Sequence, residues 1–279
     1  MNHNAPVDQA QGLRRLFAPM TSRLQPRRAA PAVRLVPVVA NPHATHSGAV
    51  LERLAAAFAE LGEHTLVVDA CDGLGAPHEA TAEALAGAIE HMAPQLSYLA
   101  AGGLPLRHVD ARGSTATFLH ALVEAAPHAS VLIVHAGATE LCRLFAHGSV
   151  RPLLLADDRP DAVTHAYASL KLLATRAGLM SHDLLLCAAT TSPRAARIAE
   201  RLASCADSYL GAVQHDWAHI DPAGAETPGP ELLRMVRAQL RSTARLGAPT
   251  ERPAVHTSMP TLADAPWLRG AAGAAAFAH

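Results

Sequence analysis

Between its polar N-terminus and its second apolar run, the chain reads Arg34-Leu-Val-Pro-Val-Val-Ala-Asn-Pro-His-Ala-Thr-His-Ser-Gly-Ala-Val-Leu-Glu-Arg-Leu-Ala-Ala-Ala-Phe-Ala-Glu-Leu-Gly62. Residues 35–40 are apolar enough for a buried strand, residues 41–48 form a polar loop, and residues 49–61 carry a helical pattern that stops at Gly62. Residues 65–69 supply a second strand, which ends in Asp69. A strand, a loop, a helix and a second strand in this order indicate a parallel β-α-β unit.

The same alternation continues through residues 34–246. Apolar or β-branched runs predict strands at 35–40, 65–69, 97–101, 130–135, 152–156, 184–188 and 209–213, and helical patterns fall near 49–61, 79–93, 114–126, 161–177, 193–206 and 231–246. Apolar strands separated by helices are typical of a parallel sheet covered on both faces. We therefore expect an α/β, doubly wound, mostly parallel sheet, whose ligands bind beyond the carboxyl ends of the strands.

The composition limits the classes of function. With 279 residues, 50% of them hydrophobic, the chain can bury a full core. A formal net charge of −1 creates no general attraction for nucleic acid, so no nucleic-acid partner is expected. The four cysteines are far apart, the first residues lack an apolar signal segment, and no run of about 18 apolar residues occurs. These features predict a cytoplasmic protein with reduced thiols.

Four regions differ in composition. Residues 1–17 contain a short helix candidate, and residues 18–33 form a linker rich in proline and arginine, because proline blocks a helix and the arginines stay solvated. Residues 34–246 hold the folded domain. Residues 247–279 contain several prolines and an Ala/Gly run without an apolar period, which predicts a disordered tail.

The first strand, loop and helix resemble the start of MinD/ParA-type ATPases, whose loop reads G-K-G-G-x-G-K-[ST] and whose second strand ends in Asp-x-Asp. Residues 41–48 align with that loop, and its diagnostic residues differ. Pro42 and Ser47 stand at the positions of the two lysines, and Gly48 stands at that of the magnesium-binding hydroxyl. Pro42 also removes a backbone N–H donor. Other residues replace the loop glycines: His43, Ala44 and His46.

Further positions that the resemblance assigns to the nucleotide site have also changed. Asp69 is kept, but Cys71 stands at the second aspartate, His135 at the magnesium-supporting aspartate and Ala188 at the asparagine that reads the base. The only lysine, Lys171, lies in a predicted helix far downstream of the loop. Because phosphoryl transfer depends on positioning and charge stabilisation, we expect no ATPase activity and no resident cofactor. ATP and Mg²⁺ would bind only if the altered loop retains affinity for them.

The loop alone is equally compatible with a generic α/β sheet that never bound phosphate. A second segment, Asp161-Ala-Val-Thr-His-Ala-Tyr-Ala-Ser-Leu-Lys-Leu-Leu173, resembles a helix of bacterial flagellar-number regulators of the FlhG (FleN) type, with His165 in place of an aspartate. An ordinary amphipathic helix would match this segment only in the spacing of its buried apolar residues. Residues 184–202 and 209–213 resemble the strand, helix and strand that follow in that family.

The N-terminal segment Asp8-Gln-Ala-Gln-Gly-Leu-Arg-Arg15 resembles the D-Q-A-x-x-L-R element that opens FlhG proteins and stimulates FlhF, a signal-recognition-particle-type GTPase. Asp8 suits a helix N-cap, and Gln11 stands in capping-box position. A helix this short is marginal alone, so we expect it to order on a partner surface, although permanent docking on its own domain is an alternative. The residues expected to bind the partner are Asp8, Gln9, Ala10, Leu13, Arg14, Leu16 and Phe17.

Two further sequence features are weaker indicators of function. His215 and His219 are four residues apart, but Pro222 and the lack of an apolar period predict a loop there. No zinc-type framework occurs, so no metal site is expected. Residues 231–245 form a basic amphipathic helix, which we expect to cover the sheet, with weak membrane association as the alternative.

The resemblance implies a non-enzymatic regulator of bacterial flagellar number or placement that acts through protein contacts, chiefly with an FlhF-like GTPase. It leaves open a flagellar transcriptional regulator, a flagellar switch or C-ring protein and a second copy of the chain as further partners, and peripheral attachment to the inner membrane at the cell pole. Two alternatives remain: a MinD/ParA-like ATPase that still binds nucleotide, with Arg53 in place of lysine, and a MinD-like adaptor unrelated to flagella.

Overall fold

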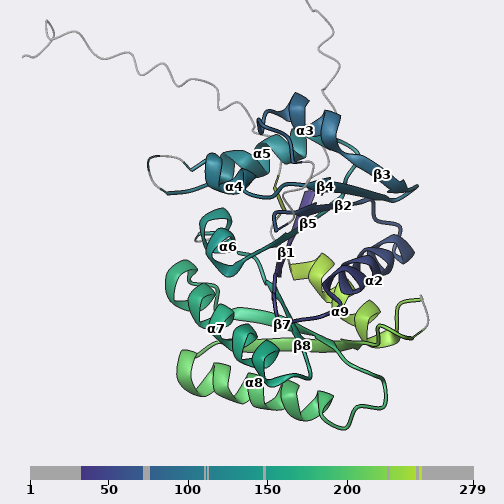
Figure 1. The fold of residues 1–279 in the computed structure, drawn as a ribbon, viewed down its shortest axis with the longest axis vertical. Coiled ribbons are helices and arrows are strands. Elements are labelled where there is room, and N and C mark those ends of the chain that lie inside the picture. The colour runs from purple at the N-terminus through teal and green to yellow at the C-terminus, as the bar shows by residue number, and fades with distance from the viewer. Residues whose placement is uncertain are drawn as a thin grey trace, which may run out of the picture. The chain divides into compact units, whose positions relative to one another are not determined.

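A nine-stranded sheet forms the centre of the computed structural model, which describes residues 33–71, 76–109, 111, 113–146, 149–224, 227–242 and 245–246 (Figure 1). The predicted N-terminal helix, the linker up to residue 32 and the tail 247–279 lie outside the described residues. The strands are β1 (Val33–Val39), β2 (Thr65–Asp69), β3 (Glu90–Ala93), β4 (Leu96–Ala100), β5 (Val131–Ala136), β6 (Leu153–Asp157), β7 (Ser181–Cys187), β8 (Val213–Ile220) and β9 (Arg245–Leu246).

The sheet runs in the order β3-β4-β2-β5-β1-β6-β7-β8, with β9 beside β1. The pairs from β4 to β8 are all parallel, whereas β3 pairs antiparallel with β4 and β9 pairs antiparallel with β1. This arrangement confirms the predicted doubly wound α/β fold. It also places the carboxyl ends of β1, β2 and β5 next to one another at one edge of the sheet.

Helices cover both faces of the sheet. They are α2 (Ser47–Glu60), α3 (Ala82–Ala88), α4 (Leu104–Arg107), α5 (Ala116–Ala125), α6 (Ala138–Leu144), α7 (Pro160–Ala177), α8 (Ala195–Leu210) and α9 (Pro230–Ser242). One apolar core lies under α2 and α9, with Leu54, Phe58 and Met235 fully buried. The other lies under α3 to α8, with Leu122 and Leu170 among its buried residues. In Figure 1, α2 and α9 accordingly lie together on one face.

Several predicted elements differ from the structure. The helix expected at 79–93 ends at Ala88, and Glu90–Ala93 form the edge strand β3, in which all four residues are exposed. Only Leu85 is buried in α3, so there is no apolar face to extend the helix. The strand expected at 209–213 is instead the end of α8, which stops at Gly211 in the left-handed conformation that glycine adopts readily (φ +64°).

The segment predicted as a loop around His215 and His219 is strand β8. Its sequence is polar and its burial partial, so only its pairing with buried β7 identifies it as a strand. The helix expected at 231–246 ends at Ser242, and 245–246 pair with β1 as β9. The short helices α4 and α6 were not predicted.

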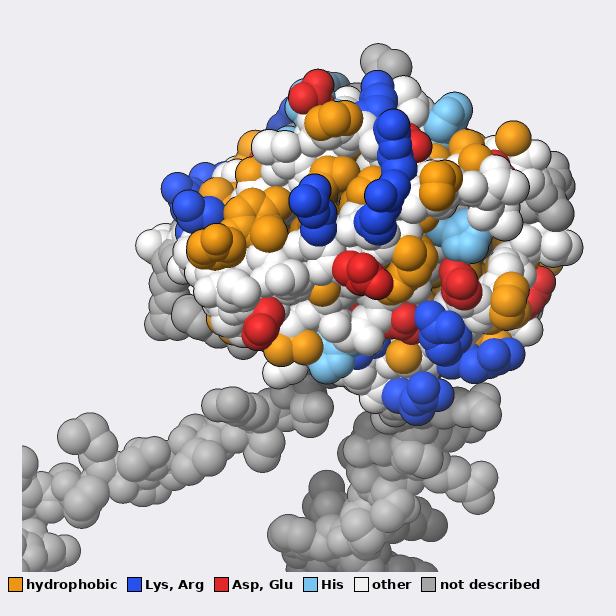
Figure 2. All heavy atoms as spheres, turned by 90° about the horizontal axis from the view of Figure 1, so that it is seen from below, with side chains coloured by type: hydrophobic (Ala, Val, Ile, Leu, Met, Phe, Trp, Pro, Cys, Tyr) orange, Lys and Arg blue, Asp and Glu red, His pale blue; other side chains and the backbone are white. Residues whose placement is uncertain are grey.

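No helix in the described part of the chain is long and apolar enough to cross a membrane. Figure 2 shows one face of the molecule, on which basic side chains lie in separate groups among acidic and apolar ones. That mixture of signs agrees with the net charge near zero and gives this face no continuous basic surface.

Candidate functional site

A cavity of about 630 Å³ opens at the carboxyl ends of β1, β2 and β5, against α7. Several residues predicted for the nucleotide site line it: Pro42, Ser47, Cys71 and His135. Ligands of doubly wound folds bind at this edge of the sheet, so the cavity is the candidate functional site. Other lining residues come from α6 and α7, including Glu140, His165 and Ser169.

The other residues predicted for the nucleotide site are not among those that line the cavity. Asp69 lies beside His135, and His43 packs its ring against that of His165, with 5.5 Å between the ring centroids. Gly48 is the second residue of α2 and is exposed. Ala188 is buried after β7, where its N–H donates to the carbonyl of Ile220, so the structure does not bring it to this cavity.

Neither Arg53, considered as a replacement for the loop lysines, nor Lys171, the only lysine of the chain, lines the cavity. Arg53 donates a hydrogen bond to the Gly224 carbonyl at 3.2 Å and lines a separate cavity of about 140 Å³ near the end of β8. Lys171 is exposed on α7, whereas Leu172 and Ser169 of the same helix face the cavity. Neither residue is positioned to neutralise a phosphate at the loop.

The loop between β1 and α2 is held by hydrogen bonds within the protein. The buried Asn41 amide donates to the carbonyls of Leu155, at 2.8 Å, and of Ala162, at 2.9 Å. Its own side-chain oxygen accepts the N–H of His43 at 3.1 Å, and its main-chain carbonyl accepts the N–H of Ala44 at 3.0 Å. These bonds fasten the loop to the end of β6 and to the first turn of α7.

The next loop N–H, that of Thr45, points at the carboxylate of Asp157 at 3.4 Å, with the Thr45 hydroxyl 3.5 Å from the same oxygen. Asp157 ends β6, is 4% exposed, and pairs with the Arg159 guanidinium at 3.0 Å. A phosphate-binding loop turns successive free N–H groups toward an anion. Here Pro42 has no N–H, and those of His43, Ala44 and Thr45 are all occupied by the protein's own oxygens.

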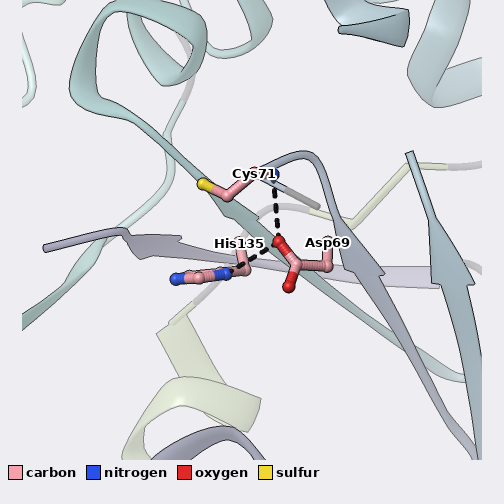
Figure 3. A group of neighbouring side chains, drawn as sticks. All are labelled: Asp69, Cys71 and His135. Atoms are coloured by element: carbon pink, nitrogen blue, oxygen red, sulfur yellow. Dashed lines mark hydrogen bonds and ion pairs between the residues drawn. The ribbon is translucent and has the colours of Figure 1, made fainter. Parts of the chain in front are cut away.

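A second feature of the cavity is a cluster formed by Asp69, Cys71 and His135 (Figure 3). Asp69 and His135 are register partners across β2 and β5, and His135 Nδ1 lies 3.0 Å from Asp69 Oδ1. The same carboxylate oxygen accepts the N–H of Cys71 at 3.0 Å. His135 is 5% exposed, and its Nε2 is buried without a hydrogen-bond partner in the described part of the chain. One possible metal-ligand atom from each residue lies within 4.8 Å of the others.

The electrostatic environment of the cavity is negative around the thiol. Burial of the thiol among protein atoms, followed by the carboxylates of Asp69 and Glu140, raises the pKa of Cys71 to about 11. Burial and the neighbouring His43 lower the pKa of His165. At neutral pH the cavity therefore presents a protonated thiol and a neutral His165 beside carboxylates, which is unfavourable for a polyphosphate anion.

Sequence reasoning missed Asn41, Glu140 and Asp157. Asp157 and Asn41 carried a usable signal, because each is a polar residue at or just beyond the end of a predicted parallel strand, where ligands bind. Their pairing partners could not be inferred, since Asn41 and Leu155 are 114 positions apart.

No model of a known protein family matches this sequence, and no curated protein sequence matches it. Solved structures do match the fold. The MinC:MinD cell division protein complex of Aquifex aeolicus is similar with a TM-score of 0.51 at 11% identity, over 79% of this chain and 99% of that chain. The MinD cell division protein of the same organism gives a TM-score of 0.50 at 10% identity, over 77% and 99%. The chain therefore has a MinD/ParA-like fold.

Proposed function

We propose that this protein is an FlhG-like regulator of bacterial flagellar number or placement that acts through protein contacts and has lost ATP hydrolysis. Its main partner is an FlhF-like GTPase, engaged by residues 8–17. The fold supports the MinD-like part of this proposal. The flagellar part depends on the resemblance of residues 8–15 and 161–173 to FlhG proteins.

The observation that carries the loss of ATP chemistry is the hydrogen bonding of the loop. A buried carboxylate, that of Asp157, takes the N–H of Thr45, and Asn41 takes those of His43 and Ala44. Binding a phosphate at these N–H groups would break these bonds, and the nearest cation, Arg159, is already paired with Asp157 at 3.0 Å. This arrangement supports a protein that keeps the fold and no longer responds to nucleotide.

A partner that binds outside the cavity fits the same architecture. One solved MinD protein of this fold is in a complex with MinC, so the fold is compatible with a protein partner. In our proposal the detachable element is Leu13, Leu16 and Phe17, which form an apolar stripe at helical spacing beside Arg14.

The proposal is tested by adding the intact protein, or a peptide of residues 1–20, to the cognate FlhF-like GTPase and measuring GTP turnover. We expect both to stimulate turnover. A matched peptide carrying Leu13→Asp and Phe17→Asp is expected to have no effect, because it loses the apolar stripe. If neither the protein nor the peptide stimulates the GTPase or forms a complex with it, the proposed partner is wrong.

A second candidate is a MinD/ParA-like ATPase that binds nucleotide in a modified way. The observation in its favour is the cavity of about 630 Å³ beside the loop, a volume typical of a small-molecule site. Equilibrium dialysis with ATP and Mg²⁺ separates the two: saturable binding at millimolar nucleotide supports the second candidate, and its absence supports the first. A chain that binds neither nucleotide nor the GTPase would be a non-flagellar MinD-like adaptor.

A further inference from the structure

We propose that Asp69, Cys71 and His135 form a binding site for a borderline or soft divalent metal ion such as Zn²⁺. The three residues come from the ends of β2 and β5, two neighbouring parallel strands, and line or adjoin the main cavity. This inference goes beyond the proposed regulatory function and does not depend on it.

The distances suit a metal ion of this kind. A tetrahedral zinc ion with Zn–N of about 2.0 Å and Zn–S of about 2.3 Å keeps its ligand atoms roughly 3–4 Å apart. The ligand atoms of the three residues already lie within 4.8 Å of one another, and His135 Nδ1 and Asp69 Oδ1 are 3.0 Å apart. Cys71 is an exposed free cysteine two residues beyond the end of β2, so its side chain has room to rotate toward the other two ligand atoms.

Two of the three ligand residues are held in place by contacts within the protein. His135 is fixed in β5 by its pairing with β2, and Asp69 is fixed by its bond from the Cys71 N–H. In Figure 3 the sulfur of Cys71 and the ring of His135 lie on the same side of the Asp69 carboxylate.

The donor set decides which ion is favoured. Thiolate and imidazole ligands prefer Zn²⁺, Co²⁺ or Cu⁺ over Mg²⁺, which prefers oxygen ligands in octahedral geometry. The carboxylates of Asp69 and Glu140 lie near the thiol and oppose its ionisation. A divalent cation reverses this effect, since it stabilises the thiolate and offsets both carboxylates. The cavity leaves room for water or another ligand at the fourth position.

The same three residues could instead suggest a Cys–His–Asp nucleophile. Such a site needs a lowered thiol pKa and a bond from the thiol to the imidazole. Here the imidazole of His135 is bonded to Asp69 through Nδ1, and its Nε2 has no hydrogen-bond partner, the thiol included, in the described residues. The geometry therefore favours a metal site over a nucleophile.

The test uses the full chain, purified without a metal-affinity tag, stripped with a chelator and titrated with Co²⁺. We expect stoichiometric binding with a thiolate-to-cobalt charge-transfer band in the near ultraviolet and visible bands of a tetrahedral ion. Added Zn²⁺ should abolish both, and excess Mg²⁺ should leave them unchanged. The sulfur band separates this site from adventitious binding by any of the chain's 17 histidines.

Two variants and one control complete the test. Cys71→Ser should remove the sulfur band, and His135→Gln should weaken Co²⁺ binding at least tenfold. Cys205→Ser changes another exposed free cysteine and should behave as the unmodified chain. Cys71 is exposed, so its variant should fold even if His135→Gln does not, which circular dichroism checks. A chain without the sulfur band, or a band that persists in Cys71→Ser, overturns the proposal.

Discussion

At the scale of single residues, β7 buries two adjacent titratable side chains, His182 and Asp183, both 0% exposed. Asp183 is met by Arg151 Nε at 2.9 Å and by the Gln239 amide at 2.8 Å. Burial lowers the pKa of His182 to about 4, with nearby Gln214 partly opposing the shift. These residues lie away from the candidate site, so they report on the stability of the fold alone.

We predict that His182 makes the protein less stable in acid. An unfolded histidine binds a proton near pH 6.5, whereas folded His182 binds one only near pH 4. Stability is therefore fully present above pH 6.5 and falls as the pH drops toward 4, by about 2 kcal/mol between pH 7 and pH 5. In urea unfolding at pH 7 and pH 5, the His182→Leu protein should lose about 2 kcal/mol less unfolding free energy between the two pH values than the original protein.

The comparison must be made between variants, because the pKa of Asp183 is raised, chiefly by burial, and so contributes with the opposite sign below neutral pH. Equal losses in the original and the His182→Leu protein between pH 7 and pH 5 would show that His182 is not the group responsible.

A second residue-scale prediction concerns the buried ion pair. Arg151→Met leaves Asp183 without its cation, so we expect the free energy of unfolding to fall by about 3–5 kcal/mol. Arg234→Met is the matched control, because Arg234 pairs with Asp216 at 2.7 Å but is 58% exposed, and an exposed pair contributes at most about 1 kcal/mol. Urea unfolding of both variants at pH 7 measures the difference, and similar losses in the two would contradict this reading.

At the scale of elements, the loop between β1 and α2 shows which features the sequence predicts and which only the structure shows. The strand and helix on either side could be predicted from their apolar patterns, since both bury continuous apolar faces. Cys71 and His135 could be assigned to the site from the resemblance to the MinD/ParA pattern, and His135 also stands at the end of a predicted strand. The pairing of the loop with Asp157 could not, because those residues meet only after β1 and β6 are side by side. Polar β8 was missed for the same reason.

Asn41→Ala should loosen this loop. It removes two bonds that the amide donates to buried carbonyls and the acceptor of the His43 N–H. Buried groups left unsatisfied cost about 1–3 kcal/mol, so we expect a loss of roughly 2 kcal/mol in unfolding free energy. His46→Ala is the control, since His46 is exposed and makes no side-chain cap bond to α2. A loss for Asn41→Ala as small as that of the control would mean that Asn41 does not hold the loop.

At the scale of the whole molecule, the chain has a MinD/ParA-like fold. We propose that it also carries a partner-binding element at residues 8–17, which lie outside the described residues. The fold class was predictable because strands and helices alternate along residues 34–246. The function of the N-terminal element stays a prediction, because residues 8–17 lie outside the residues that the structure describes.

The most direct test is GTP turnover by the cognate FlhF-like GTPase, measured with the intact chain in the presence and absence of ATP and Mg²⁺, and with a chain that lacks residues 1–17. We predict equal stimulation with and without ATP, because the N–H groups of His43, Ala44 and Thr45 are already paired, and no stimulation by the shortened chain. Stimulation that requires ATP, or that survives removal of residues 1–17, would contradict the account.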